Sequence, residues 1–305
     1  MTVAAGTALD EASVDRARER FARHEKLAPW MLMAPALVLA LIFFGIPALS
    51  MLRMSFNLKV DQRLYVPDFT AQNYWTLVSN PLFTNAIWTT VKLSLIASLI
   101  TVLLGYAFAL ITWLKPSGSR LLLVGLALCP LLISEISIIF GWWMFFPKNG
   151  LLSYALVNSG LIKDKFSLMY TEFAALVGLV YITLPYCYFI LLSILDGIDK
   201  RMLEASADLG ASPVRTFTEV LLPLTRPGLI VAFSQTFIWA MGTYATPSAL
   251  GPDTLWTMGF LIQEQMLGKN NWPMACALAM VLAAGVAVVI MFTRSFMKPE
   301  QSYHV

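Results

Sequence analysis

The sequence predicts an all-α integral membrane protein with six transmembrane helices. Hydrophobic residues make up 58% of the 305 residues and charged residues only 13%, against roughly 25% charged residues in a soluble domain. Six apolar runs also reach the length of about 20 residues that is needed to cross the hydrocarbon core of a bilayer. The composition therefore excludes a soluble globular protein, and its richness in aliphatic residues excludes a disordered chain.

The six predicted spans follow one another along most of the chain. They are Trp30–Leu52, Ile87–Leu114, Leu121–Phe146, Phe173–Leu195, Leu229–Leu250 and Pro273–Phe292. The first run follows a charged segment, Asp10–Lys26, and it exceeds the apolar core of about 7 to 15 residues in a cleaved signal peptide. We therefore expect it to remain as an anchor helix. Three prolines, Pro130, Pro185 and Pro247, are candidates for local breaks in the spans.

The basic residues favour a cytoplasmic location for both termini. With the N-terminus inside, thirteen of the 21 lysines and arginines fall on the cytoplasmic side, seven fall outside, and Lys92 lies in the second span. Cytoplasmic loops carry an excess of such residues. The cytoplasmic thirteen are Arg16, Arg18, Arg20, Arg23, Lys26, Lys115, Arg120, Lys200, Arg201, Arg215, Arg226, Arg294 and Lys298; the outer seven are Arg53, Lys59, Arg63, Lys148, Lys163, Lys165 and Lys269.

Residue types that carry chemistry are scarce. The only histidines, His24 and His304, lie near the termini, and the three cysteines, Cys129, Cys187 and Cys276, fall inside apolar runs without a CxxC pair. The cysteines are interpreted as small core residues, and we expect neither a metal site nor catalytic residues. A net charge of +3 is too slight for a nucleic-acid-binding protein. The chain also lacks the GxxxxGK[ST] motif, so ATP must be bound elsewhere.

Two outer connections have features of their own. The loop Arg53–Ala86 carries Tyr65, Tyr74 and Trp75 among polar residues, a composition that suits the membrane interface. It could serve as an interfacial anchor or as a docking surface for an external partner. The segment Leu151–Ile162 is apolar but too short to cross a bilayer, and it is expected to form a helix at the outer face.

The longest cytoplasmic connection, Asp196–Gly228, has the pattern of a helix, a glycine turn and a second helix. The first helix is predicted over Asp199–Leu209, and Gly210 can end it with positive φ. Ser212 is a natural N-cap and is followed by proline, a residue favoured in the first turn, so the second helix should run from Pro213 to Leu221. Further prolines at 223 and 227 are expected to punctuate the return to the membrane. This pattern is typical of a docking element.

The same residues show a resemblance to a known family. The order Glu204-Ala205-Ser206, three residues, Gly210, nine residues, Val220-Leu221-Leu222-Pro223 resembles the EAA loop of binding-protein-dependent ABC importer permeases. The spacing agrees at every position, with serine for the second alanine and valine for isoleucine. The resemblance implies the type I ABC importer permease architecture: a six-span permease domain over 30–296 with a coupling loop at 196–228, and cytoplasmic segments at 1–29 and 297–305.

What the resemblance implies about partners follows from this loop. In such importers the short helix inserts into a cleft on an ATPase dimer, which binds ATP and Mg²⁺, and the permease itself binds no cofactor. A second permease subunit, expected to form a heterodimer, and an external solute-binding protein complete the complex in the bacterial inner membrane, surrounded by lipid. The residues assigned to coupling are Glu204, Ala205, Ser206, Gly210, Leu222 and Pro223. An apolar side of the loop is expected from Leu209, Val214, Phe217, Val220 and Leu221.

Glu135 is the first candidate for the substrate path, because it is the only acidic residue deep in a predicted span. Measured along one continuous helix from Leu121, it lies about 21 Å in, at 1.5 Å per residue. It could pair with a cationic substrate or with Lys92, or it could be a structural carboxyl. Polar residues inside spans usually face the bundle interior and mark substrate pathways.

The fifth span supplies most of the other candidates. Gln235, Trp239 and Thr243 recur at a four-residue spacing and so share a helical face, and Tyr244 follows them. Further hydroxyl groups in this span come from Ser234, Thr236 and Thr246. Trp142 in the third span completes the set. Such a stripe suits a path for a polar solute, although hydroxyl and small residues also hold membrane helices together.

The solute and the transport class follow mainly from the resemblance. The chain is most similar to permeases of the spermidine and putrescine group, whose relatives also carry opines, so a polyamine or opine-like solute is implied. The stretch Ser137–Trp142 departs from the polyamine pattern of arginine before aromatic-alanine-tryptophan. The alternative is a secondary carrier that uses Glu135 as an ion or proton site, although such carriers commonly contain repeats and none is seen here.

Overall fold

The computed structural model describes residues 31–60 and 63–296. The predicted cytoplasmic segments at 1–29 and 297–305, including Asp10–Lys26, lie outside these ranges. The chain divides into two compact units, Met1–Met54 and Ser55–Val305. In the first unit an apolar helix begins at Met31 and extends to Ser55, with a π-helical turn η1 (Leu41–Gly45) before α2 (Ile46–Ser55). The first predicted span is therefore helical, as expected.

The second unit begins with small elements that lead into the long helices. Two antiparallel strands, β1 (Leu58–Val60) and β2 (Arg63–Val66), precede α3 (Gln72–Ser79). Asn73 on α3 donates hydrogen bonds to the carbonyls of Ser55 (2.8 Å) and Asn57 (2.9 Å), which ties the predicted interfacial loop together.

The remaining elements are helical. The long helices are α4 (Pro81–Leu114), α5 (Ser117–Leu132), α8 (Glu172–Asp196), α11 (Leu222–Gly242) and α14 (Trp272–Phe296). The shorter ones are α6 (Glu135–Phe145), α7 (Leu151–Asn158), α9 (Arg201–Asp208), α10 (Pro213–Thr216), η2 (Phe217–Leu221), α12 (Ala245–Leu250), α13 (Met258–Gln263) and η3 (Glu264–Gly268). The helix expected at Leu151–Ile162 is thus present as α7.

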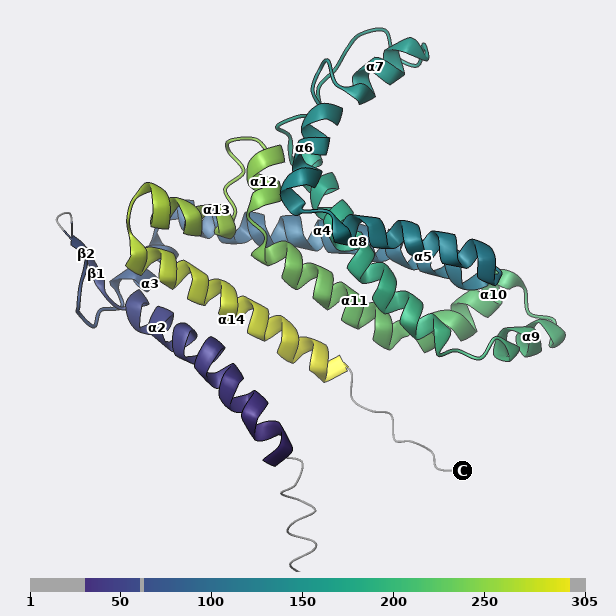
Figure 1. Ribbon diagram of the computed structural model, residues 1–305, viewed down its shortest axis with the longest axis horizontal. Helices are drawn as coiled ribbons and strands as arrows, with labels where there is room; N and C mark the ends of the chain where they lie inside the picture. The colour runs from purple at the N-terminus through teal and green to yellow at the C-terminus, as the bar shows by residue number, and fades with distance from the viewer. Residues whose placement is uncertain (1–30, 61–62, 297–305) are drawn as a thin grey trace, which may run out of the picture. The chain divides into compact units, whose positions relative to one another are not determined.

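The helices α4, α8 and α11 pack against one another and form the centre of the unit (Figure 1). Their contacts use small residues: Ala97 and Ala109 are fully buried, and a Cβ added to Gly105 would lie 2.8 Å from the Cys187 sulfur. Small residues allow membrane helices to approach closely where lipid provides no hydrophobic driving force. Buried Cys187 therefore acts as a small core residue, as predicted.

The third predicted span is not one continuous helix. The structure contains five helices that are long and apolar enough to cross a membrane, and α5 with α6 would form a sixth span bent by 99°. Ile133 and Ser134 are extended between the two helices. Pro130 lies in the last turn of α5, where it lacks an amide donor and crowds the preceding turn. The depth of about 21 Å given to Glu135 on one straight helix is therefore wrong, because Glu135 begins a new helix.

The fifth predicted span differs at both ends. One helical stretch runs from Pro213 through η2 to Gly242, so Pro223 and Pro227 lie within a helix and do not punctuate the loop. Beyond Gly242 the chain is extended at Thr243, and α12 then begins at Ala245. The prediction of one helix over Leu229–Leu250 is therefore wrong. Of the three prolines considered for breaks, only Pro130 immediately precedes one, while Pro185 lies inside unbroken α8.

Candidate coupling and translocation sites

The predicted helix–glycine–helix pattern is present in the connection between α8 and α11. The first helix, α9, ends before Gly210, whose φ of +82° lies in the left-handed region. A Cβ at Gly210 would meet no atom within 4 Å, so the backbone conformation rather than space requires glycine here. The Ser212 hydroxyl then accepts a hydrogen bond from the Arg215 amide (3.3 Å), and Pro213 occupies the first turn of α10. The expected capping residues therefore act as predicted.

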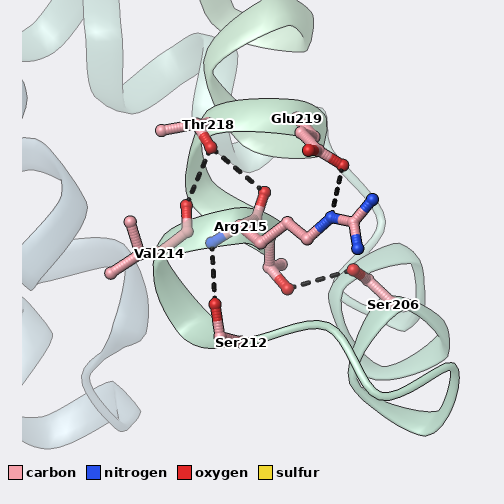
Figure 2. Close-up of polar contacts among 7 residues, drawn as sticks. Ser206, Ser212, Val214, Arg215, Thr218 and Glu219 are labelled. Carbon is pink, nitrogen blue, oxygen red and sulfur yellow. Dashed lines mark hydrogen bonds and ion pairs between the residues drawn. The ribbon is translucent and has the colours of Figure 1, made fainter.

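Polar contacts stabilise this loop, one between its two arms and one within the second arm. The hydroxyls of Ser206 on α9 and Thr216 on α10 are 3.0 Å apart, and the Arg215 guanidinium donates to Glu219 (2.9 Å; Figure 2). Lys200, just before α9, also contacts the bundle. Its Nζ donates a hydrogen bond to the Trp113 carbonyl (2.9 Å) and lies 5.1 Å from the centre of the Trp113 ring. The loop is thus connected by specific contacts to the end of α4.

Most of the residues predicted to act in coupling are exposed on the surface of the loop. Glu204 and Ala205 are exposed on α9, whereas Ser206 is half-buried by its contact with α10. Figure 1 shows α9 and α10 at the end of the bundle opposite α13. Leu222 and Pro223 are exposed in the first turn of α11. The motif residues therefore lie in two places, on α9 and in the first turn of α11.

The apolar side expected for the loop is divided between two environments. Leu221 is 3% exposed and packs in the core with Phe217 against the end of the bundle, whereas Leu209 is 90% exposed and Val214 is 72% exposed. A cavity of about 340 Å³ separates α9 from the bundle, with Leu203 among its lining residues. The two exposed apolar side chains thus lie at the turn, outside the bundle core.

Glu135 lies where two broken helices meet. It is the first residue of α6, and its Oε1 accepts a hydrogen bond from Thr246 Oγ1 (2.7 Å) and a long one from Thr243 Oγ1 (3.5 Å). Lys92 instead pairs with Glu172 at the start of α8 (3.3 Å), so the alternative in which Lys92 pairs with Glu135 is wrong. Lys92 could not be assigned to Glu172 from the sequence, because the prediction placed Glu135 inside one continuous span, whereas in the structure both carboxylates begin helices.

The stripe expected on the fifth span is interrupted. Gln235 and Trp239 are exposed on α11, where Trp239 stacks on Tyr186 of α8 (4.9 Å between ring centres). Thr243 and Tyr244 lie in the break that follows, so they do not continue the helical face. Of the predicted path residues, the structure brings Thr243 to Glu135.

Trp142 belongs to an aromatic cluster on α6. Its ring stacks on Phe146 (4.7 Å between centres) and meets Tyr181 of α8 edge-on (5.5 Å). Its buried indole N–H makes no hydrogen bond to the described residues, so packing alone holds the ring. Sequence reasoning did not single out Tyr181, and it included Thr246 only as one of the polar residues of the fifth span. No group of metal-ligating side chains occurs within residues 31–60 and 63–296.

Comparison with known proteins assigns this geometry to a family. The family described as "Binding-protein-dependent transport system inner membrane component" matches residues 99–296. The chain belongs to this family. It is 34% identical over 251 residues to the spermidine/putrescine transport system permease protein PotB of Haemophilus influenzae, covering 82% of this chain and 87% of that protein. PotB of Escherichia coli K12 is 31% identical over 250 residues, covering 82% of this chain and 90% of that protein.

Solved structures agree with the fold. A bacterial ABC transporter that imports the acidic polysaccharide alginate has a TM-score of 0.73 at 19% identity, covering 92% of this chain and 98% of that chain. The MetNI methionine ABC transporter has a TM-score of 0.55 at 19% identity, covering 75% of this chain and 97% of that chain. The chain is therefore a multi-pass membrane protein and a permease subunit of an ABC importer, as the EAA-like spacing predicted. Its relatives are transport permeases, which agrees with a chain that is not itself an enzyme.

Proposed function

We propose that this permease imports a polyamine or opine-like solute across the bacterial inner membrane. The observation that supports the solute is the 31–34% identity, over 82% of the chain, to spermidine/putrescine permeases. The chain would form half of a translocation pathway, with a second permease subunit as the other half. An external solute-binding protein delivers the solute, and both termini lie in the cytoplasm.

The loop at 196–228 is proposed to couple the permease domain, 30–296, to a separate ATPase dimer that holds ATP and Mg²⁺. Three features support this role: Glu204 is exposed, the turn at Gly210 is fixed by its positive φ, and Leu209 is 90% exposed beside them. A carboxylate can accept strong hydrogen bonds from a cationic partner, and an apolar side chain outside the spanning helices gains most from burial against a protein. Ala205 and Ser206 offer small side chains for close approach, and Leu222 and Pro223 connect the loop to α11.

The coupling proposal is tested by expressing the chain with its neighbouring genes and measuring ATPase co-purification and solute uptake. Glu204→Lys or Gly210→Asp should abolish both while the permease stays in the membrane at its normal level. Gly118→Asp is the matched control, since Gly118 lies at the start of α5 with no atom within 4 Å of an added Cβ. Normal uptake by either loop variant would refute the coupling role, and so would a wild-type complex in which no ATPase co-purifies.

A further inference from the structure

Two helix breaks that are far apart in the sequence meet at one carboxylate. The break between α5 and α6 lies directly before Glu135, and the break between α11 and α12 contains Thr243. Glu135 joins them by accepting hydrogen bonds from Thr243 and Thr246. Non-helical backbone at membrane depth is tolerated where it is buried in protein or lines a cavity. The convergence of two breaks therefore marks a position at which the bundle can open to a solute.

The carboxylate at this point has no cationic partner among the residues that the structure describes. None of the ion pairs among residues 31–60 and 63–296 includes Glu135, and the cation proposed for it from the sequence, Lys92, pairs with Glu172. Hydroxyl donors reach Oε1, while Oε2 accepts no hydrogen bond from the described residues. Acidic residues in membrane spans are costly and usually pair with another group. A ligand cation would supply the missing charge.

A cavity with aromatic lining lies along α6, the helix that Glu135 begins; Glu135 itself is not among its lining residues. Glu135, Ile138, Trp142 and Phe145 follow one another at spacings of three and four residues, so they share a face of the helix. The last three line a cavity of about 420 Å³, together with Tyr181 of α8 and the residues at 133, 137 and 141. Aromatic faces attract cations, and an apolar wall suits a methylene chain. The cavity therefore fits an aliphatic chain that ends in a charged amine.

Close packing around Thr246 fixes the position of its side chain beside Glu135. It is fully buried on α12, and a Cβ added to Gly178 of α8 would lie 2.6 Å from its methyl group. The helix α12 also contacts α6 (Figure 1), and the Trp143 indole N–H donates to the Ala249 carbonyl (3.0 Å). This close packing fixes the direction of the Thr246 hydroxyl toward Glu135.

We propose that Glu135 and the cavity lined by Ile138, Trp142, Phe145 and Tyr181 form a subsite for the ammonium end of an aliphatic amine. Thr246 acts as a positioning residue that orients the carboxylate. The inference rests on the proposed amine-importing function, and it deepens that function by naming the residues that recognise the charge during passage through this subunit.

The test uses the complete complex in proteoliposomes, with its ATPase, second permease and binding protein, and measures radiolabelled putrescine uptake and ATPase activity together. Glu135→Gln should lower uptake by about tenfold, since a charge-assisted contact is lost, while ATPase stimulation by the loaded binding protein is retained. Thr246→Val should have a smaller effect that Thr246→Ser rescues. Glu172→Gln, which alters the other carboxylate at a helix start, is the matched control and should transport normally.

The outcomes separate the two proposals. Unchanged uptake by Glu135→Gln in a complex whose wild type transports putrescine would overturn the subsite alone. An equal fall of uptake and ATPase stimulation would also overturn it, because it would show a structural role for Glu135. A wild-type complex that transports opines but no putrescine or other aliphatic amine would overturn the polyamine assignment and the subsite together.

Discussion

A leucine at the end of a bundle helix and a leucine in the coupling loop differ completely in exposure. Leu195, in the last turn of α8, is completely buried against the core, whereas Leu209, at the end of α9, is 90% exposed. An exposed leucine on a spanning helix can face lipid, but Leu209 lies between the spanning helices α8 and Pro213–Gly242, in a part of the loop that carries several charged residues. The comparison teaches that an exposed apolar side chain of the bundle, such as Leu103 on α4 (72% exposed), lies on a helix that lipid can surround, whereas Leu209 lies outside the spanning helices.

Two glycines, one in the bundle and one in the loop, are required for different physical reasons. Gly105 on α4 is required by space, because the Cys187 sulfur would lie 2.8 Å from an added Cβ. Gly210 in the loop has open space around it but adopts a φ of +82°. The bundle thus depends on close approach of helices, and the loop depends on the shape of a turn.

The largest expected effect comes from filling the space at the helix contact. Gly105→Leu should destabilise the bundle by about 3 kcal/mol, the upper end of the usual cost of overpacking, because the backbone of Tyr188 is also within 4 Å of the new Cβ. Thermal unfolding of the purified protein in detergent measures it. Gly125→Leu on α5 is the control, since no atom lies within 4 Å there. Equal stability of the two variants would show that α4 and α8 do not need this contact.

A matched pair of leucines tests the comparison directly. Leu195→Ala should cost about 2 kcal/mol of stability, mainly through the cavity that it leaves, because lipid tails are as apolar as leucine. Leu209→Ala should leave the unfolding temperature unchanged, yet weaken association of the ATPase when both are titrated in detergent. If Leu209→Ala lowered stability as much as Leu195→Ala, the turn would belong to the bundle rather than to a partner interface.

Most of the fold could be predicted from the sequence, because span length and hydropathy are local properties. The turn at Gly210 and the cap at Ser212 were likewise predictable, since each depends on residues within a few positions. Of the two breaks, the one after Pro130 was among the candidates that the prolines suggested, whereas the one at Thr243 was not predicted, because hydropathy averaged over a span does not register extended backbone. Runs of apolar residues fix the number of spans more firmly than their continuity.

The candidate substrate site was predicted only in part for a related reason. Glu135 was identified by its rarity in a span, but its partner Thr246 lies more than a hundred residues away and is one of several threonines in that region. Which of them reaches the carboxylate depends on how α12 packs on α6 and α8. Similarly, Lys92 forms its ion pair with Glu172 because the start of α8 lies beside it, and this could not be inferred from the position of either residue along its own span.

The smallest expected effects come from polar contacts, and salt should distinguish the two regions. The hydroxyls of Thr101 and Thr183 are 3.0 Å apart and both buried between α4 and α8, so Thr101→Val should cost about 0.6 kcal/mol at any ionic strength. Arg215 and Glu219 form an exposed pair on consecutive turns, so Arg215→Gln should cost about 0.3–0.5 kcal/mol at low salt and almost nothing at 1 M salt. Thermal unfolding with and without salt measures both. A salt-sensitive Thr101→Val, or an Arg215→Gln effect that persists at 1 M salt, would contradict the assignment of one contact to the dry interior and the other to water.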